Sequence, residues 1–325
     1  MKKNKYILLI LIILIIAFFY SQKKNDKLTK KIFVNKIVDH YALDQTVLGI
    51  IDALKEKGVY DSIEFKVESS QGNPSLVSQI NNNSIAKKAF MIIGVGTLPA
   101  QNAAKYALEN KTKLLFSSVT DPVSADLAYE NGLKTNISGV SNFVQLEPQL
   151  DLFRKIMPNI KKIGIIFNAG ESNSVSIINK LENICPKFDI NLVKQSITNS
   201  SQAYQAAIKL SSLVDAIFIS NDNTALSSLQ TIIKAASEAK IPVFVSDTDA
   251  VKSGALAALG PNQYQVGYQT GNMAASIILG KNINDIPIEF PTTTELFLNI
   301  DMAKKLNINF TDELLNQANT IIGDK

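Results

Sequence analysis

The chain has 325 residues, of which 46% are hydrophobic and 19% are charged, so it is long enough for two globular domains. Its net charge of +4 is concentrated near the N-terminus, because residues 1–31 carry eight lysines and one acid and the remainder carries 25 basic and 28 acidic groups. A slightly acidic body excludes the basic surface that nucleic-acid binding requires. One cysteine and one histidine exclude an internal disulfide and a Cys/His zinc site.

The N-terminal segment has the pattern of a targeting signal. Lys2, Lys3 and Lys5 precede an unbroken apolar run over 6–20, as in the basic and apolar regions of an export signal. The run is shorter than the ~20 residues that span a bilayer comfortably. Neither a small-x-small cleavage pattern nor a cysteine that could carry a lipid follows it. We expect residues 1–30 to be a signal peptide or an uncleaved membrane anchor plus a linker, with the body exported to the periplasm or another extracytoplasmic space.

Strand and helix patterns alternate from residue 32 onward. Short apolar runs are typical of strands buried on both faces of a parallel sheet, and apolar residues at helical spacing indicate helices. The expected strands are 32–38, 63–67, 89–95 and 114–119, and the expected helices are 43–54, 76–88 and 99–108. Repeated strand–helix units of this kind predict a parallel sheet with helices on both faces.

The same alternation begins again after a junction at 137–143. The expected strands are 162–167, 190–194, 216–220 and 241–246, and the expected helices are 146–157, 174–181, 204–213 and 226–239. The remaining elements, at 255–259, 268–279, 286–290 and 296–299, are too few for a third lobe and are expected to return to the first two. We therefore predict an α/β protein of two doubly wound parallel-sheet lobes with a hinge, formed by 31–140 with 266–290 and by 141–265 with 291–325.

Five expected strands end in small polar residues, at 94–97, 117–121, 168–174, 220–224 and 246–249. Ligands bind at the carboxyl ends of the strands in open α/β sheets. Asp121, Asp222 and Asp247 could neutralise a ligand cation, whereas Thr97, Ser118 and helix N-terminal amides could hold a ligand carboxylate. Each of these residues is also an ordinary helix cap. Together they predict a site for a zwitterion such as an amino acid.

Other kinds of site match the sequence poorly. Gly94 and Gly96 lie between a strand and a helix, as in a dinucleotide fingerprint, but Pro99 replaces the third glycine. No Walker loop and no Gly-x-Ser-x-Gly elbow occur. His40 could act as a general base, but no nucleophile–base pair accompanies it, and a loop or pocket-lining role fits better. Cys185 is expected to be a small buried hydrophobe. We predict no catalytic residues, no metal and no cofactor.

A series of short motifs resembles the ABC transporter substrate-binding proteins, in the group that includes tryptophan- and phenylalanine-binding members. The motifs lie at 38–44, 96–101, 118–123, 138–142, 171–174, 222–224, 246–249 and 254–257. The resemblance runs from about Ile32 to Ile322, nearly the whole body, and the ordered set of motifs is specific although no single motif is. Many relatives from Gram-positive bacteria carry a lipidated cysteine that this chain lacks.

The resemblance implies a type I periplasmic-binding fold, with three crossings between the lobes and a cleft that closes on its ligand. It implies that Thr97, Ser118, Thr120 and Asp121 line one side of the cleft and that Asn173, Asp222, Asn223 and Asp247 line the other. Tyr41 is the candidate for an aromatic contact, because the chain has no tryptophan.

We therefore predict a solute-binding protein of an ABC importer that holds a small amino acid-like ligand, with aromatic amino acids among the candidates, and delivers it to an ABC permease in the membrane. One alternative is a ligand sensor with the same lobes anchored by an uncleaved N-terminal helix. Another is an α/β enzyme that uses His40. Replacing His40 by alanine would abolish turnover in an enzyme, but would change ligand affinity only a few fold if His40 is peripheral.

Overall fold

The first sheet collects strands from the N-terminal part of the chain, and all its neighbours are parallel. The computed structural model describes residues 29–110 and 112–324. The strand order is β2-β1-β3-β4-β7, so the chain starts inside the sheet and winds outward in both directions. The strands are β1 (Lys30–Lys36), β2 (Ile63–Ser69), β3 (Met91–Val95), β4 (Lys113–Val119) and β7 (Ile137–Ser141). A small antiparallel hairpin, β5 (Ala128–Tyr129) and β6 (Gly132–Leu133), lies between β4 and β7 in the chain.

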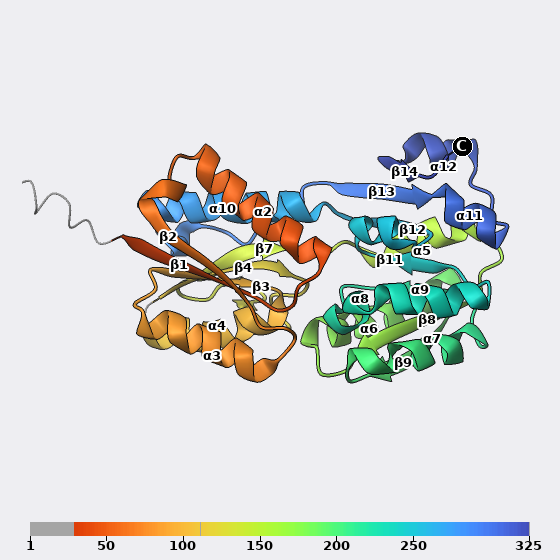
Figure 1. Cartoon of the computed structure of the whole chain (residues 1–325), viewed down its shortest axis with the longest axis horizontal. Coiled ribbons are helices and arrows are strands. Elements are labelled where there is room, and N and C mark those ends of the chain that lie inside the picture. Colours follow the sequence, from red (N-terminus) through yellow and green to blue (C-terminus); the bar gives the residue numbers. More distant parts are fainter. Residues whose placement is uncertain (1–28, 111, 325) are drawn as a thin grey trace, which may run out of the picture.

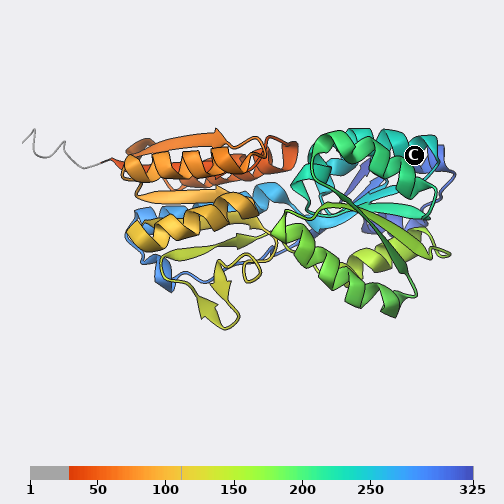
Figure 2. The same cartoon turned by 90° about the horizontal axis from the view of Figure 1, so that it is seen from below.

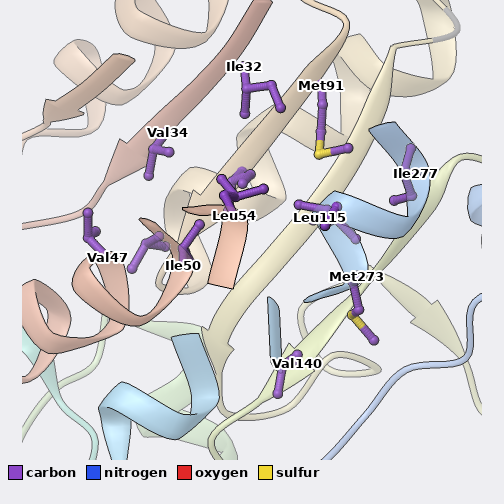
Figure 3. Close-up of a cluster of buried hydrophobic side chains, with 14 of the residues drawn as sticks. Ile32, Val34, Val47, Ile50, Leu54, Met91, Leu115, Val140, Met273 and Ile277 are labelled. Carbon is purple, nitrogen blue, oxygen red and sulfur yellow. The ribbon is translucent and has the colours of Figure 1, made fainter. Parts of the chain in front are cut away.

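Four helices cover the two faces of this sheet. Helices α2 (Tyr41–Glu56) and α10 (Gln263–Ile278) lie on one face, and α3 (Pro74–Ala86) and α4 (Thr97–Asn110) lie on the other (Figure 1). Figure 3 shows Ile32, Met91 and Leu115 of the sheet facing Ile50 of α2 and Ile277 of α10, all of them buried. This core forms because the apolar positions of α2 recur at helical spacing and therefore share one face. We call the first sheet with these helices the N-terminal lobe.

The second sheet has the order β14-β13-β12-β11-β10-β8-β9. Its strands are β8 (Lys162–Asn168), β9 (Asn191–Ile197), β10 (Ala216–Ile219), β11 (Val243–Val245), β12 (Ala257–Pro261), β13 (Thr294–Asn299) and β14 (Thr320–Ile322). The neighbours from β9 to β12 are parallel, whereas β13 runs antiparallel to β12. The α/β fold of two doubly wound sheets predicted from the sequence is confirmed, with two strands, β13 and β14, added antiparallel at one side.

The helices that pack with this second sheet are α5 (Leu146–Ile156), α6 (Ser172–Ile184), α7 (Ala203–Ser211), α8 (Asn223–Ser227), α9 (Leu229–Glu238), α11 (Ile300–Leu306) and α12 (Asp312–Gln317). In its core the Phe153 ring of α5 stacks on the Phe244 ring of β11, with centroids 4.2 Å apart. Short 3-10 turns occur at Tyr60–Ser62, Cys185–Phe188, Ser200–Gln202, Thr248–Ser253 and Ile283–Asp285. We call the second sheet with its helices the C-terminal lobe.

The chain passes between the lobes at three places, so neither lobe is one continuous segment. It leaves β7 for α5, returns from β12 to α10, and leaves again before β13. Figures 1 and 2 show the two lobes side by side along the long axis, with these connections between them. The lobe boundaries at 140, 265 and 290 stay a prediction.

Helix α10 packs against α2 at unusually short range, which fixes the end of α10 that reaches the middle of the molecule. A Cβ placed on Gly267 would lie 1.9 Å from the carbonyl oxygen of Thr46, and one placed on Gly49 would lie 2.1 Å from the carbonyl oxygen of Tyr264. Only glycine allows this approach. The close contact holds Gln263, the first residue of α10, next to β4.

Four details differ from the sequence prediction. The expected helix 226–239 is divided at Ser228 into α8 and α9, and α10 begins at Gln263 instead of residue 268. The junction at 137–143 is largely strand β7, and the segment 286–290 makes only one bridge, between Val140 and Glu289. Cys185 is buried, as expected.

Residues 1–28, and with them the predicted signal or anchor, lie outside the described residues. Within the described ranges no helix is both long enough and apolar enough to span a bilayer.

Candidate functional site

A cavity lies where the strand ends of the two lobes face each other. Its volume is only about 20 Å³, far below the ~300 Å³ at which small-molecule sites begin, so side chains from the two lobes nearly fill it in this structure. Its lining combines residues from both lobes: His40, Ala42, Leu43, Thr97, Ser118, Thr120, Asn142, Asn173, Asn221, Asn223, Leu226, Asp247 and Gln263. Six of the nine residues predicted from the sequence are in this set, whereas Tyr41, Asp121 and Asp222 are not.

The wall from the N-terminal lobe is built at the end of β4. Ser118 has a φ of +55°, a left-handed conformation that is uncommon for a serine, and the pairing of β4 with β7 shifts register there. This local kink turns the buried Ser118 hydroxyl toward α10, where it donates to Oε1 of Gln263 at 3.0 Å. The Thr46 hydroxyl of α2 lies 3.1 Å from the same Ser118 oxygen. Two helices therefore hold Ser118 in place.

Thr97 and Thr120 complete this wall, and both are buried. The Thr120 hydroxyl donates to Oδ1 of Asn142 at 3.2 Å, so the first connection between the lobes is tied to the end of β4. Thr97 is the first residue of α4, directly after β3. Hydroxyl and amide groups dominate this wall, and none of these groups carries a charge at neutral pH.

The wall from the C-terminal lobe is held together by two carboxylates that do not line the cavity. Glu171 accepts hydrogen bonds from the backbone N–H groups of Asn223 and Thr224, both at 3.0 Å. It also accepts from the side-chain amide of Asn223 at 2.7 Å. The Asn173 amide donates to the carbonyl oxygen of Asn221 at 2.7 Å. The start of α8 is therefore occupied by protein carboxylates, which corrects the expectation that its amides are free to hold a ligand anion.

Asp222 is fully buried and joins three elements, which is a structural role that the sequence prediction missed. Its carboxylate accepts from the backbone N–H of Asn168 and from the Ser174 hydroxyl, both at 2.6 Å, and from the N–H of Ala225 at 2.7 Å. Burial raises the pKa of Asp222, and the nearby charge of Glu171 raises it further. In this structure the Asp222 oxygens face β8, α6 and α8 and not the cavity, and a contact between Asp222 and a ligand stays a prediction.

Asp247 is the carboxylate that does line the cavity. It follows β11 and accepts the backbone N–H of Asp249 at 3.2 Å, which caps the following 3-10 turn. The side chain is 95% buried, yet it forms no salt bridge within the described ranges. Burial raises the pKa of Asp247 to about 7, and the nearby charge of Asp249 adds to the rise. The charge of Lys252 offsets only part of this rise, because the Lys252 ammonium pairs with Asp249 at 2.9 Å.

His40 lies opposite, at the start of α2. Its Nδ1 accepts the backbone N–H of Leu43 at 3.5 Å and so caps the helix. Burial lowers the pKa of His40 to about 4 and outweighs the Asn223 amide and the Asp44 charge, which raise it. His40 lines the cavity, in agreement with the pocket-lining interpretation and against a peripheral position.

Asp121 connects the two lobes and does not line the cavity in this structure, and its predicted contact with a ligand stays a prediction. Its carboxylate accepts from the Ser176 hydroxyl at 2.6 Å and from the Lys180 ammonium at 3.0 Å, and both of these residues belong to α6 of the other lobe. Burial alone would raise the pKa of Asp121, but the hydrogen bonds from Ser176, Ser124 and Lys180 lower it to about 2.

Tyr41 lies at the mouth of the cavity. Its side chain is 54% exposed and lines a wider surface hollow that shares His40 and Asp247 with the cavity. The Lys252 ammonium of the other lobe is 5.5 Å from the centre of the Tyr41 ring, a distance at which a cation is attracted to an aromatic face. An aromatic contact with a ligand at this place stays a prediction.

Sequence reasoning missed several lining residues, chiefly Asn142, Asn221 and Gln263. Asn142 and Asn221 directly adjoin predicted positions, so the polar strand ends could have indicated them. Gln263 carried no such signal, because it reaches the cavity through the close packing of α10 on α2. The described residues contain no group of three or more His, Cys, Asp or Glu side chains placed to hold a metal ion.

Two α/β lobes joined by three crossings, with a polar cavity between their strand ends, define the class of two-lobed ligand-binding proteins. The sequence pattern of the family described as ABC transporter substrate binding protein matches residues 31–322. The chain therefore belongs to this family, which is one of solute-binding proteins and not of enzymes.

Relatives of known name or structure agree with this assignment. The chain is 31% identical over 293 residues to a protein named Tyrosine-binding protein from Clostridioides difficile, covering 89% of this chain and 84% of that protein. It resembles the crystal structure of an ABC domain in complex with L-Trp from Streptococcus pneumonia, with a TM-score of 0.87, 26% identity and coverage of 90% and 100%. It also resembles the ligand-free, open structure of a substrate binding protein with adhesive properties from Clostridium difficile, with a TM-score of 0.68, 30% identity and coverage of 91% and 100%.

Proposed function

We propose that this chain is the extracytoplasmic solute-binding protein of an ABC importer and that it binds an amino acid in the cavity between its lobes. The observation that carries the proposal is the environment of Asp247. A carboxylate that is buried without a cation is energetically costly, and its raised pKa reflects that cost. The ammonium group of an amino acid would supply the missing positive charge.

The opposite wall suits the other end of a zwitterion. Thr97, Ser118 and Thr120 present hydroxyl groups there, without an acidic side chain among the residues of that wall. We therefore propose that the six predicted residues in the lining, together with Gln263 and His40, surround the ligand. The names of two relatives, one tyrosine-binding and one solved with L-Trp, support an aromatic amino acid as the ligand.

Binding would proceed by closure of the lobes about the three crossings, with the lobes divided at 140, 265 and 290. A ligand shifts a conformational equilibrium only by its differential affinity for the two states. Closure without a ligand buries the Asp247 charge unpaired, whereas closure on an amino acid buries it paired with an ammonium group. The ligand thus favours the closed form by removing a penalty that is largest in the closed form.

The likeness to solved structures supports a closed arrangement of the lobes in this structure. The two neighbours are similarly related to this chain, at 26% and 30% identity, but the L-Trp complex gives a TM-score of 0.87 and the ligand-free, open structure gives 0.68. Contacts across the lobes agree with closure, because Ser176 and Lys180 reach Asp121, and the Ser172 hydroxyl lies 3.3 Å from Oε1 of Gln101.

Export and delivery to a membrane permease complete the proposed role. The basic and apolar pattern of residues 1–20 favours export, either with cleavage or with retention as an anchor. The permease would recognise the closed, ligand-bound form, so the two lobes would contact it together.

A thermal-shift screen tests this function. The full-length chain is mixed with the twenty amino acids, purines, sugars and small peptides, and its melting temperature is measured. A ligand that binds only the folded protein stabilises it by about 2.7 kcal/mol at a hundred times its Kd. We expect aromatic amino acids to raise the melting temperature. If sugars or purines do so and amino acids do not, the proposed ligand class is wrong.

A further inference from the structure

One buried nitrogen in the lining of the cavity has no hydrogen-bond partner. Among the described residues, three buried side-chain polar atoms lack a hydrogen bond of good geometry, and Nε2 of His40 is the one whose residue lines the cavity, where the Asn223 amide is its polar neighbour. Buried polar atoms are nearly always hydrogen-bonded in native proteins. A buried polar atom without a hydrogen bond beside a binding cavity therefore indicates that a ligand atom forms that hydrogen bond.

The other ring nitrogen determines what Nε2 can offer. Nδ1 accepts the Leu43 N–H, so in the neutral ring the proton lies on Nε2, which becomes a donor. The ring is neutral at pH 7, because burial holds its pKa near 4 against the carboxylates of Asp44 and Glu171 and the amide of Asn223, while Lys36 lowers it further. His40 therefore presents an N–H group to the cavity.

Two hydroxyl donors of the same wall are already engaged. A hydroxyl has one hydrogen to donate. Ser118 donates its hydrogen to Gln263, and Thr120 donates to Asn142. The Thr97 hydroxyl makes no hydrogen bond among the described residues and is available as a second donor. The N-terminal lobe thus has hydrogen-bond donors without acceptors, at His40 and Thr97. The C-terminal lobe has the Asp247 carboxylate, which forms no salt bridge.

We infer that His40 Nε2 donates a hydrogen bond to the carboxylate of the amino acid ligand and thereby selects amino acids over the corresponding amines. This inference rests on the proposed function and assigns the two ends of the ligand to the two lobes. The ammonium group pairs with Asp247 of the C-terminal lobe, and the carboxylate meets His40 of the N-terminal lobe. Each end of the ligand then contributes to closure, and His40 becomes a specificity-determining residue.

The substitution His40→Asn isolates this hydrogen bond. Asparagine is a strong N-cap, so its shorter side chain keeps the bond to the Leu43 N–H while losing the group that reaches the cavity. Calorimetric titration of the full-length wild type and variant uses two matched pairs, L-tyrosine with tyramine and L-tryptophan with tryptamine. Each amine lacks only the carboxylate. Asp247→Asn is the matched control, and it is titrated with L-tyrosine and 3-(4-hydroxyphenyl)propionate, which lacks only the amino group.

We expect His40→Asn to weaken amino acid binding about ten- to hundredfold, the range for hydrogen bonds to charged groups, and to leave the binding of the amines unchanged. The preference for amino acid over amine then collapses. Asp247→Asn should instead collapse the preference for L-tyrosine over its analogue without an amino group. Equal loss for amino acid and amine, or no loss for either, overturns the assignment of His40 while leaving the proposed function intact. A wild type that binds no amino acid overturns the proposed function and this inference together.

Discussion

Asp247 and Asp121 each follow a strand end that the sequence marked as polar, but the structure surrounds them in opposite ways. Asp121 receives hydrogen bonds from Ser176, Lys180 and Ser124, and its pKa is lowered to about 2. Asp247 receives one backbone N–H, and burial raises its pKa to about 7. The comparison separates a carboxylate whose hydrogen bonds join the two lobes from a carboxylate beside the cavity with one hydrogen bond, to which the proposed function assigns the ligand cation.

The largest effect is expected from Asp247→Asn. Asparagine can still cap the 3-10 turn, but it removes the charge that pairs with the ligand, and losing one partner of a buried charge pair costs about 2–5 kcal/mol. We expect ligand affinity to fall about a hundredfold or more in calorimetric titration. Unchanged affinity would show that the unsatisfied carboxylate does not bind the ligand.

The same variant should be more stable than the wild type when no ligand is present. The pKa of Asp247 is raised from 3.8 to about 7 in the folded protein, so the native state binds the proton more tightly than the unfolded state. Its charge therefore lowers stability progressively as the pH rises from about 4 to 7, and the full cost remains above that range. Melting curves should show Asp247→Asn gaining a few degrees at pH 8 and almost nothing at pH 4. A loss of stability at pH 8 would contradict this account.

Asp222→Ala should act in the opposite direction on stability. The change removes the cap of α8 and leaves the N–H of Asn168 without its partner, for a combined loss of about 2 kcal/mol or more. We expect a lower melting temperature, by about 4–8 °C at 2–4 °C per kcal/mol. Ser174→Ala, which removes one of the three donors to Asp222, provides the smaller matched change. A melting temperature equal to that of the wild type would show that Asp222 has no structural role.

Asp121→Asn should weaken ligand binding several fold without touching the ligand. The contact with Lys180 is partly exposed, so its loss costs about 1 kcal/mol of the closed form and is sensitive to salt. Affinity measured at low and high salt should differ less in the variant than in the wild type, and Lys180→Met should reproduce the result. A loss as large as that of Asp247→Asn would instead place Asp121 against the ligand.

The smallest effect is expected from Tyr41→Ala. The exposed ring meets Lys252 across the mouth of the cavity, and such contacts contribute about 0.5–1 kcal/mol. Affinity should fall two- to fivefold, whereas Tyr41→Phe should keep the wild-type value because the aromatic face remains. A large loss in both variants would indicate direct contact between the phenol group and the ligand.

Local pattern predicted the strands and the polar residues at their ends, because a buried parallel strand is an apolar run and its end must turn polar. The same reasoning predicted Thr97, Ser118 and Asp247, which line the cavity in the structure. It could not separate Asp247 from Asp222, since both are aspartates that cap the next helix or turn. The difference depends on Asn168 and Ser174, which lie about fifty residues earlier in the chain.

Local sequence patterns could not predict the contacts between the lobes either, because the contacting residues lie far apart in the chain. Ser176 and Lys180 meet Asp121 only because the two sheets face each other across the crossings. The sequence prediction began α10 at residue 268, too late, because Gln263 and its neighbours lack an apolar stripe. These residues are buried by the close glycine contact with α2. The sequence assigned His40 to the lining or a loop. It could not show that Nδ1 bonds to Leu43 while Nε2 lacks a hydrogen bond, because this depends on the position of the ring in the structure.

A crystal structure of the full-length chain with L-tyrosine bound tests the central claim most directly. The account predicts the ligand between the lobes, with its ammonium group within hydrogen-bond distance of the Asp247 carboxylate and its carboxylate at Nε2 of His40. A ligand held in the reverse orientation, or bound outside the cavity with Asp247 and His40 still unpartnered, would contradict it.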